Sequence, residues 1–146
     1  MTCFCGIDPG IEGGIAFLVD EPDPEEYDNV QIHAVDLPLT SGLPSERSLD
    51  LEELRVTLDS WRPDVILIEH QQPFAKQGAV STGKLMKAYG QLVGLAIGMQ
   101  FNVHTIRPAD WKRRSGMLPA PKDMTASQKT TFRKNQSLSA ASELYP

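Results

Sequence analysis

Cysteines and long apolar runs are both scarce in this sequence of 146 residues. Its only cysteines, Cys3 and Cys5, lie two positions apart on one apolar run, which predicts buried, reduced thiols and neither a disulfide nor a zinc site. The longest apolar stretch, around residues 92–99, contains glycines and is too short to cross a bilayer. Because no basic and apolar leader precedes Asp8, we expect a cytoplasmic protein with no membrane partner.

Basic residues are scarce in the first half of the chain and acidic residues in the second. Residues 1–69 carry 16 acidic and 3 basic side chains, whereas residues 70–146 carry 3 acidic and 11 basic ones. The net charge of −5 argues weakly against nucleic acid as a ligand. A basic half next to an acidic one instead indicates a polyanion held against bound metal. The length and the absence of internal repeats predict one domain over residues 1–146.

One carboxylate interrupts the first apolar segment. Residues 3–18 read as a strand, a turn marked by Pro9 and three glycines, and a second strand. Asp8 stands at the C-terminal end of the first strand. Two explanations are open for it: its carboxylate accepts hydrogen bonds from the turn amides, or it binds a cation.

A second carboxylate ends the apolar run of residues 65–68, where Glu69 follows it directly. A continuous apolar run of this length predicts a strand that is buried on both faces. Asp8 and Glu69 then lie at the C-terminal ends of two neighbouring strands. Hard divalent cations prefer such oxygen ligands, so the pair indicates a metal site.

The remaining elements predict a mixed α/β sheet in the order β-β-β-α-β-α-β-α, with three antiparallel strands followed by parallel ones. Asp50 and Glu53 offer a capping pair for the first helix, and Pro63 ends it. Ser81 or Thr82 is the expected N-cap of the second helix. The other elements are a strand over residues 30–37, a strand over 103–106, a basic turn over 107–114, and a last helix with a Thr125–Gln128 capping box.

Glycines recur every four residues along the second predicted helix, at Gly90, Gly94 and Gly98. Each of them costs helix propensity, so such a ridge usually marks close backbone approach. Two explanations are open: tight packing of the helix on the sheet, or a helix–helix contact across a dimer.

These motifs together resemble the RuvC family of Holliday-junction resolvases, of the phage and prophage type. The resemblance rests on the collinear segments Gly6-Ile7-Asp8-Pro9-Gly10 with Gly13-Gly14, Ile66-Leu67-Ile68-Glu69, Ala88-Tyr89-Gly90-Gln91-Leu92-Val93-Gly94 and Arg107-Pro108-Ala109-Asp110-Trp111-Lys112. It implies an RNase H-like fold and a homodimer. It also implies a crossover junction endodeoxyribonuclease of recombination and repair, which nicks a four-way DNA junction with Mg²⁺, Mn²⁺ being possible.

The resemblance also implies roles for individual residues. Asp8 and Glu69 would be the catalytic metal ligands, and Lys112 would contact a phosphate. Further basic or hydroxyl side chains are candidate DNA contacts, namely Lys76, Ser81, Thr82, Lys84, Lys87, Lys129 and Arg133. Phe74 is interpreted either as a wedge at an unpaired base or as a loop anchor. His70 and Trp111 are interpreted as structural.

The resemblance departs from the family at the C-terminal end. The family's other catalytic acids lie in a helix that follows a segment similar to residues 140–146, and we expect this chain, which ends at Pro146, to lack that helix. An inactive junction-binding or nucleic-acid-binding remnant is therefore the alternative to a nuclease. A phosphotransferase fragment of the actin and hexokinase type is a third interpretation, disfavoured because the chain has no second such hairpin domain.

Overall fold

The computed structural model describes residues 1–10, 12–20, 30–43, 46–73 and 78–144, with side chains described as far as residue 140. Its internal contacts divide the chain into two compact units, Met1–Ile106 and Arg107–Pro146, and each is described by itself. The single domain expected over residues 1–146, without the family's last helix, stays a prediction. In the described part of the chain, no helix is both long and apolar enough to cross a membrane.

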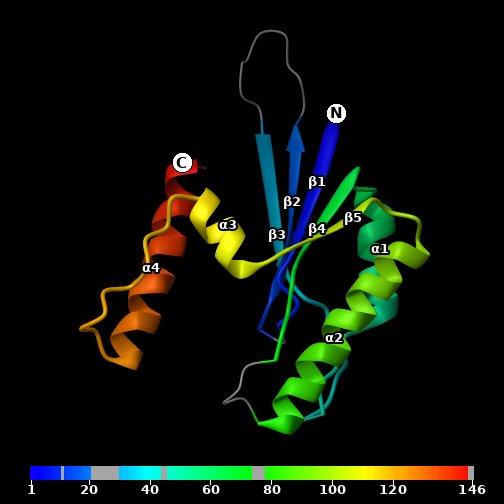
Figure 1. The fold of residues 1–146 in the computed structure, drawn as a ribbon. Coiled ribbons are helices and arrows are strands. Elements are labelled where there is room, and N and C mark those ends of the chain that lie inside the picture. Colours follow the sequence, from blue (N-terminus) through cyan, green and yellow to red (C-terminus); the bar gives the residue numbers. More distant parts are fainter. Residues whose placement is uncertain (11, 21–29, 44–45, 74–77, 145–146) are drawn as a thin grey trace, which may run out of the picture. The chain divides into compact units, whose positions relative to one another are not determined.

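The first unit contains a five-stranded sheet in the order β3-β2-β1-β4-β5 (Figure 1). The neighbours β1–β2 and β2–β3 are antiparallel, while β1–β4 and β4–β5 are parallel. This confirms the predicted meander followed by parallel strands. The strands are β1 Thr2–Ile7, β2 Gly14–Asp20, β3 Val30–Asp36, β4 Val65–Glu69 and β5 Val103–Ile106.

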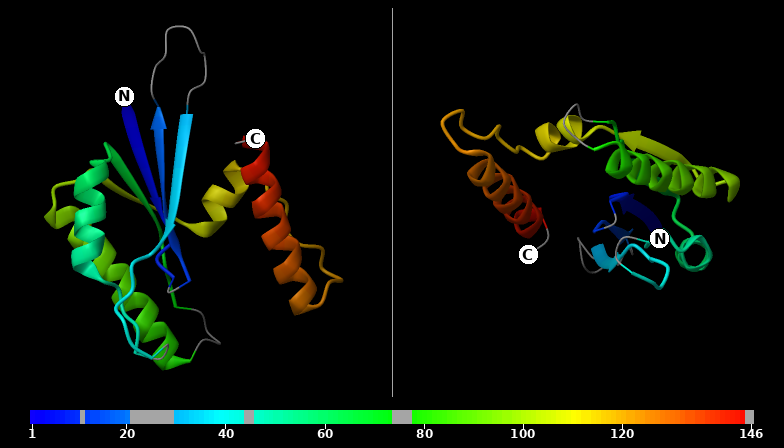
Figure 2. Two further views of the ribbon diagram at one scale, coloured as in Figure 1. Left: turned by 180° about the vertical axis from the view of Figure 1, so that it is seen from behind. Right: turned by 90° about the horizontal axis from the view of Figure 1, so that it is seen from below.

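Two helices of this unit, α1 (Leu51–Trp61) and α2 (Ala79–Gly98), share one hydrophobic core with the sheet (Figures 1 and 2). Every second residue of β1, β2 and β4 is buried in this core. Trp61, the last residue of α1, stacks on Phe17 of β2 with ring centroids 4.8 Å apart. These contacts hold the helices against a single face of the sheet.

The prediction that β4 is buried on both faces is wrong for the described residues. Ile66 and Ile68 are fully buried, whereas Leu67 between them is 39% exposed. Phe4 of β1, on the same side as Leu67, is 47% exposed. Because both helices of the unit pack against the other face, this face of β4 is partly exposed although the strand is apolar throughout residues 65–68.

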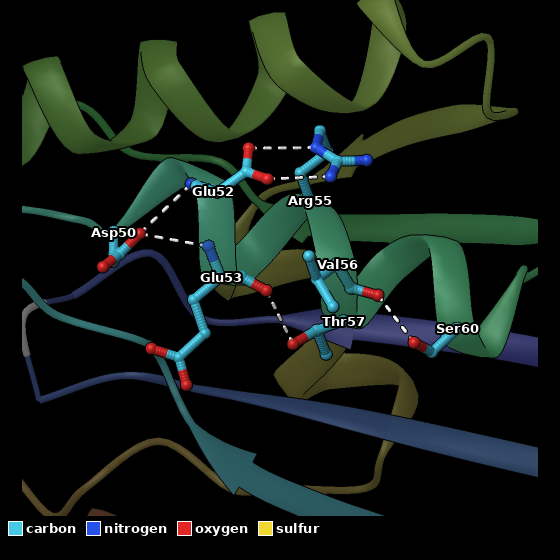
Figure 3. Close-up of polar contacts among 7 residues, drawn as sticks. All are labelled: Asp50, Glu52, Glu53, Arg55, Val56, Thr57 and Ser60. Atoms are coloured by element: carbon cyan, nitrogen blue, oxygen red, sulfur yellow. Dashed lines mark hydrogen bonds and ion pairs between the residues drawn. The ribbon is translucent and has the colours of Figure 1, made fainter.

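The first helix begins at its predicted cap (Figure 3). The Asp50 carboxylate accepts hydrogen bonds from the backbone N–H groups of Glu52 and Glu53, at 3.2 and 3.0 Å. The reciprocal bond expected from the Glu53 side chain is not formed, because the Asp50 N–H donates to the carbonyl of Pro38 at 2.9 Å. The helix ends at Arg62, which adopts the left-handed conformation one residue before the predicted Pro63 break.

The second helix begins earlier than predicted, at Ala79. Gly78 occupies the N-cap position with an extended backbone and no side-chain cap bond, and its carbonyl accepts the N–H of Thr82 at 3.0 Å. Ser81 and Thr82 therefore lie in the first turn and are not caps. Glycine at the N-cap stabilises a helix nearly as well as a hydroxyl side chain, so the start needs no hydroxyl.

The second unit contains α3 (Pro108–Arg114) and α4 (Ala126–Leu144). The basic turn predicted over residues 107–114 is instead a short helix, since Pro108 takes the first helical position and Asp110 in the first turn bonds Arg107 at 2.7 Å. This bond holds the pKa of Asp110 below its ordinary value. The capping box of α4 is confirmed, with reciprocal Thr125–Gln128 bonds of 2.8 and 3.3 Å.

Both cysteines are buried and reduced, as predicted. Burial, with Cys3 beside it, raises the pKa of Cys5 to about 12 from an ordinary value of 9.0. Because only the thiolate reacts, we expect Cys5 to resist Ellman's reagent at about pH 8 until denaturant is added. Between pH 9.0 and about 12, the Cys5 thiol loses its proton in the unfolded chain but keeps it in the folded protein. The contribution of this thiol to the free energy of unfolding therefore declines as the pH rises through that range. Rapid labelling of Cys5 in the native protein would contradict the expectation.

Candidate active site

Asp8 and Glu69 lie beside each other at one edge of the sheet. In the parallel pair of β1 and β4, Ile7 lies opposite Ile68, and the two acids come next in this register. Neighbouring strands are about 4.8 Å apart. Ile7 and Ile68 face the core, so alternation places both carboxylates on the opposite face, where Asp8 is exposed and Glu69 half-buried. The predicted juxtaposition of the pair is confirmed, and its function stays a proposal.

The turn after β1 orients Asp8. The Gly10 N–H donates to Asp8 Oδ1 at 3.1 Å, and the Asp8 N–H donates to the Gly14 carbonyl at 3.0 Å. A Cβ on Gly13 would overlap the Asp8 carbonyl oxygen, so the turn closes only with glycine at that position. The turn interpretation of Asp8 is thus correct, and it is compatible with cation binding because the bond uses one of the carboxylate's two oxygens.

Glu69 is oriented by a neutral donor. Gln71 Nε2 donates to Glu69 Oε2 at 3.1 Å, which fixes the carboxylate without neutralising its charge. His70 instead contacts α2, where its Nδ1 lies 3.0 Å from the hydroxyl of Tyr89 and the two rings meet edge-on. His70 therefore ties the end of β4 to α2, in agreement with its structural interpretation.

A third carboxylate, Asp36, lies at the same end of the sheet and was not predicted as a site residue. It pairs with Gly14, which itself binds the Asp8 N–H, so Asp36 and Asp8 flank a residue without a side chain. The signal in the sequence is that Asp36 ends the third strand of the meander, which runs in the same direction as β1. Even so, the described residues contain no group of three or more acidic, histidine or cysteine side chains that could hold a metal ion.

The donor set of Asp8 and Glu69 fits a hydrated divalent cation. Mg²⁺ keeps several waters and is usually bound by one or two carboxylates together with substrate phosphates. An exposed carboxylate beside a half-buried one provides hard oxygen ligands that are open to solvent on one side. The chemistry of the site therefore suits Mg²⁺ or Mn²⁺ whose coordination shell is completed by water and a phosphate oxygen.

The structure brings Lys112 and Arg133 together in the second unit. Both line a pocket of about 470 Å³ between α3 and α4, although they are 21 positions apart in the sequence. Arg113, which sequence reasoning did not select, lines the same pocket. Lys112 Nζ also lies 5.2 Å from the centroid of the Trp111 ring. We call this the Lys112 pocket; it is a cationic surface suited to phosphate.

Lys84 and Lys87 come together elsewhere, in a second pocket of about 130 Å³ in the first unit. Lys129 belongs to neither pocket, and its Nζ donates to the Lys122 carbonyl at 3.2 Å. Ser81 and Thr82 lie in the first turn of α2. Lys76 and Phe74 fall outside the described residues.

Comparisons with known proteins give one kind of match. No protein-family model and no curated protein matches the sequence. A solved structure of Thermus thermophilus RuvC matches with 16% identity and a TM-score of 0.52, covering 98% of this chain and 96% of that one. T. thermophilus RuvC in complex with a Holliday junction substrate matches with 16% identity and a TM-score of 0.54, covering 99% and 97%. The fold is that of RuvC.

The predicted RNase H-like α/β class is thereby confirmed, with α3 as an additional short helix. The likeness to RuvC extends through both units, because the alignments cover nearly the whole chain. Within this RuvC fold, the two carboxylates lie at the end of the central parallel strand pair.

Proposed function

We propose that this protein is a metal-dependent endonuclease that resolves four-way DNA junctions. One observation carries the proposal: Asp8 and Glu69 are held side by side at the ends of β1 and β4 in a RuvC fold. The solved RuvC complex with a Holliday junction substrate supports branched DNA as the ligand class.

In this proposal, Asp8 and Glu69 hold Mg²⁺ or Mn²⁺ against the scissile phosphodiester. When bound, the cations supply Lewis-acid stabilisation of the phosphate charge. The protein's own contribution is to orient the ligands. The turn amide of Gly10 holds Asp8, and the side-chain amide of Gln71 holds Glu69. Both donors are neutral amides, which hydrogen-bond a carboxylate without bringing a charge of their own.

The Lys112 pocket then binds the phosphate backbone of a duplex arm. Lys112, Arg113 and Arg133 supply the cations, and the described lining contains no acidic side chain, although Arg113 also pairs with Asp110 at 3.3 Å. Contacts of this kind fix the orientation of DNA but do not read its sequence. We therefore expect this pocket to add affinity for DNA without adding a sequence preference.

A gel experiment with a labelled mobile four-way junction tests the proposal. We expect a junction-specific band shift and, with Mg²⁺ or Mn²⁺, symmetric nicks. Lys112→Gln should weaken junction binding roughly 5- to 10-fold and lower the salt slope by about one. Lys134→Gln, an exposed lysine of α4 that does not line the pocket, is the charge-matched control. Equal effects of the two variants would contradict the assigned role of Lys112.

A second candidate is a junction-binding protein without nuclease activity. The observation that favours it is the carboxylate pair without a larger ligand group among the described residues. A junction-specific shift without nicks at any metal concentration would support this binder, whereas metal-dependent nicks would exclude it. Absence of both a shift and nicks would refute both candidates.

We also propose that the protein forms a homodimer through α2. A Cβ built on Gly90, Gly94 or Gly98 meets no atom within 4 Å, so the predicted packing of this ridge on the sheet is wrong for the described residues. Ile97, between two of these glycines, is 58% exposed. The remaining explanation, close contact with a second copy of α2, accounts for both the glycines and the exposed isoleucine.

Gly94→Leu should raise the dimer dissociation constant at least about tenfold, because a large side chain would separate the two helices. The monomer should be at least as stable as before, since leucine is a better helix former than glycine. Sedimentation equilibrium measures the first effect and thermal unfolding the second. Gly94→Ala is the control that keeps a small residue. A monomeric wild-type protein, or an unchanged dimer in Gly94→Leu, would contradict the proposed interface.

A further inference from the structure

The pocket of about 130 Å³ in the first unit carries a concentration of positive charge. Arg47, Lys84 and Lys87 line it, and all three are exposed. Among the described residues, neither Arg47 nor Lys87 forms an ion pair. The described lining contains one acidic side chain, Glu46, against these three basic ones, so the net charge of the pocket is positive. We call this the Lys87 pocket; its charge favours an anionic ligand.

The walls of the Lys87 pocket do not suit a bare phosphate. They are largely apolar, formed by Pro9, Leu39, Leu49 and Ala88. A cavity of about 150 Å³ with apolar walls accepts a benzene ring, so the pocket of about 130 Å³ is close to the size of one flat ring. Gln91 in the lining adds an amide that can hydrogen-bond the edge of such a ring.

The pocket shares a turn with the carboxylate pair. Pro9 and Gly10 line it and directly follow Asp8, and the Gly10 N–H donates to Asp8 Oδ1 at 3.1 Å. The Pro9–Gly10 turn therefore joins the pocket to the carboxylates, which lie on the other face of the sheet. A DNA strand bound at Asp8 and Glu69 has to pass over this turn to bring a neighbouring base to the pocket. A neighbouring base can enter only when it is unpaired and unstacked, as bases at a strand crossing can be.

We propose that the Lys87 pocket binds one unstacked nucleotide of the DNA strand whose phosphodiester lies at Asp8 and Glu69. The base lies between the apolar walls, and its phosphate is bound by Arg47, Lys84 and Lys87 at the rim. This inference rests on the proposed function, which identifies the bound DNA as one strand of a four-way junction. It adds a site that recognises an unpaired base, in contrast to the phosphate contacts of the Lys112 pocket.

The test uses a short single-stranded oligonucleotide and a four-way junction, each with one 2-aminopurine, whose emission rises when it leaves the base stack. The variant is Arg47→Gln combined with Lys87→Gln, both exposed and outside the core. The control is Arg114→Gln with Lys134→Gln, which removes the same charge from residues that line neither pocket. Wild-type protein should raise the emission of the single strand, and the control should do the same.

The Arg47→Gln/Lys87→Gln variant should lose the emission rise and bind the single strand roughly 10- to 100-fold more weakly. An emission rise absent in the wild type, or unchanged in this variant, would overturn the pocket proposal whatever the nicking result. A rise on the single strand without any binding of the junction would refute the proposed junction activity and leave the pocket established. The two failures are therefore distinguishable.

Discussion

Asp8→Asn should reduce metal-dependent nicking of a four-way junction by about 10²–10³-fold, the loss expected when one group that stabilises transition-state charge is removed. The substitution keeps the shape of the side chain and the acceptor oxygen that binds the Gly10 N–H, but it removes the negative charge needed to hold a cation. Junction binding should persist, because the Lys112 pocket is unchanged. Single-turnover nicking and band shifts on the same junction measure the two effects.

Asp20→Asn is the matched control for this experiment. Asp20 is an exposed acid at the other end of the same hairpin, paired with Thr2, and its neutralisation changes the net charge equally. Glu69→Gln should behave like Asp8→Asn, since the two carboxylates act as one site. Nicking retained in either variant would show that the pair does not bind the catalytic metal.

Gly13→Ala should lower the free energy of unfolding by about 1–3 kcal/mol and abolish nicking as well. The added methyl overlaps the Asp8 carbonyl oxygen and comes within 2.7 Å of the Gly10 carbonyl oxygen, so the turn must open. Because the same turn orients the Asp8 carboxylate, its distortion displaces the proposed metal ligand.

Urea unfolding, with a four-way junction assay in parallel, measures both consequences of Gly13→Ala. Gly10→Ala is a control from the same turn, since its methyl would meet neighbouring atoms only at ordinary distances of 3.6 Å or more. It should change stability by less than about 1 kcal/mol. Equal destabilisation by the two substitutions would mean that the steric constraint at Gly13 does not hold the turn.

Much of the site was predictable because it depends on local chemistry. The hairpin glycines, the apolar runs and the acid at the end of each run are properties of short segments, and strand alternation converts them into faces. The Asp50 cap and the Thr125–Gln128 box were equally local, and hydrogen bonds over two or three residues confirm both.

The errors have two different causes, one local and one tertiary. The short helix α3 follows from the Arg107–Asp110 contact and Pro108, which the basic composition of the segment concealed. Leu67 is partly exposed because α1 and α2 both pack on the other face of the sheet. No pattern along the chain reports which face of a sheet receives its helices.

The sequence by itself determined the order of the strands and of the three longer helices, the turn that holds Asp8, and the position of each acid at the end of a strand. Tertiary structure alone decided which of these residues meet. Parallel pairing joined Asp8 to Glu69 across 61 positions, and folding brought Lys112 beside Arg133 and Arg47 beside Lys87. Local hydrogen bonding and sterics act over a few residues, whereas a binding site depends on contacts between segments that only the packed core brings together.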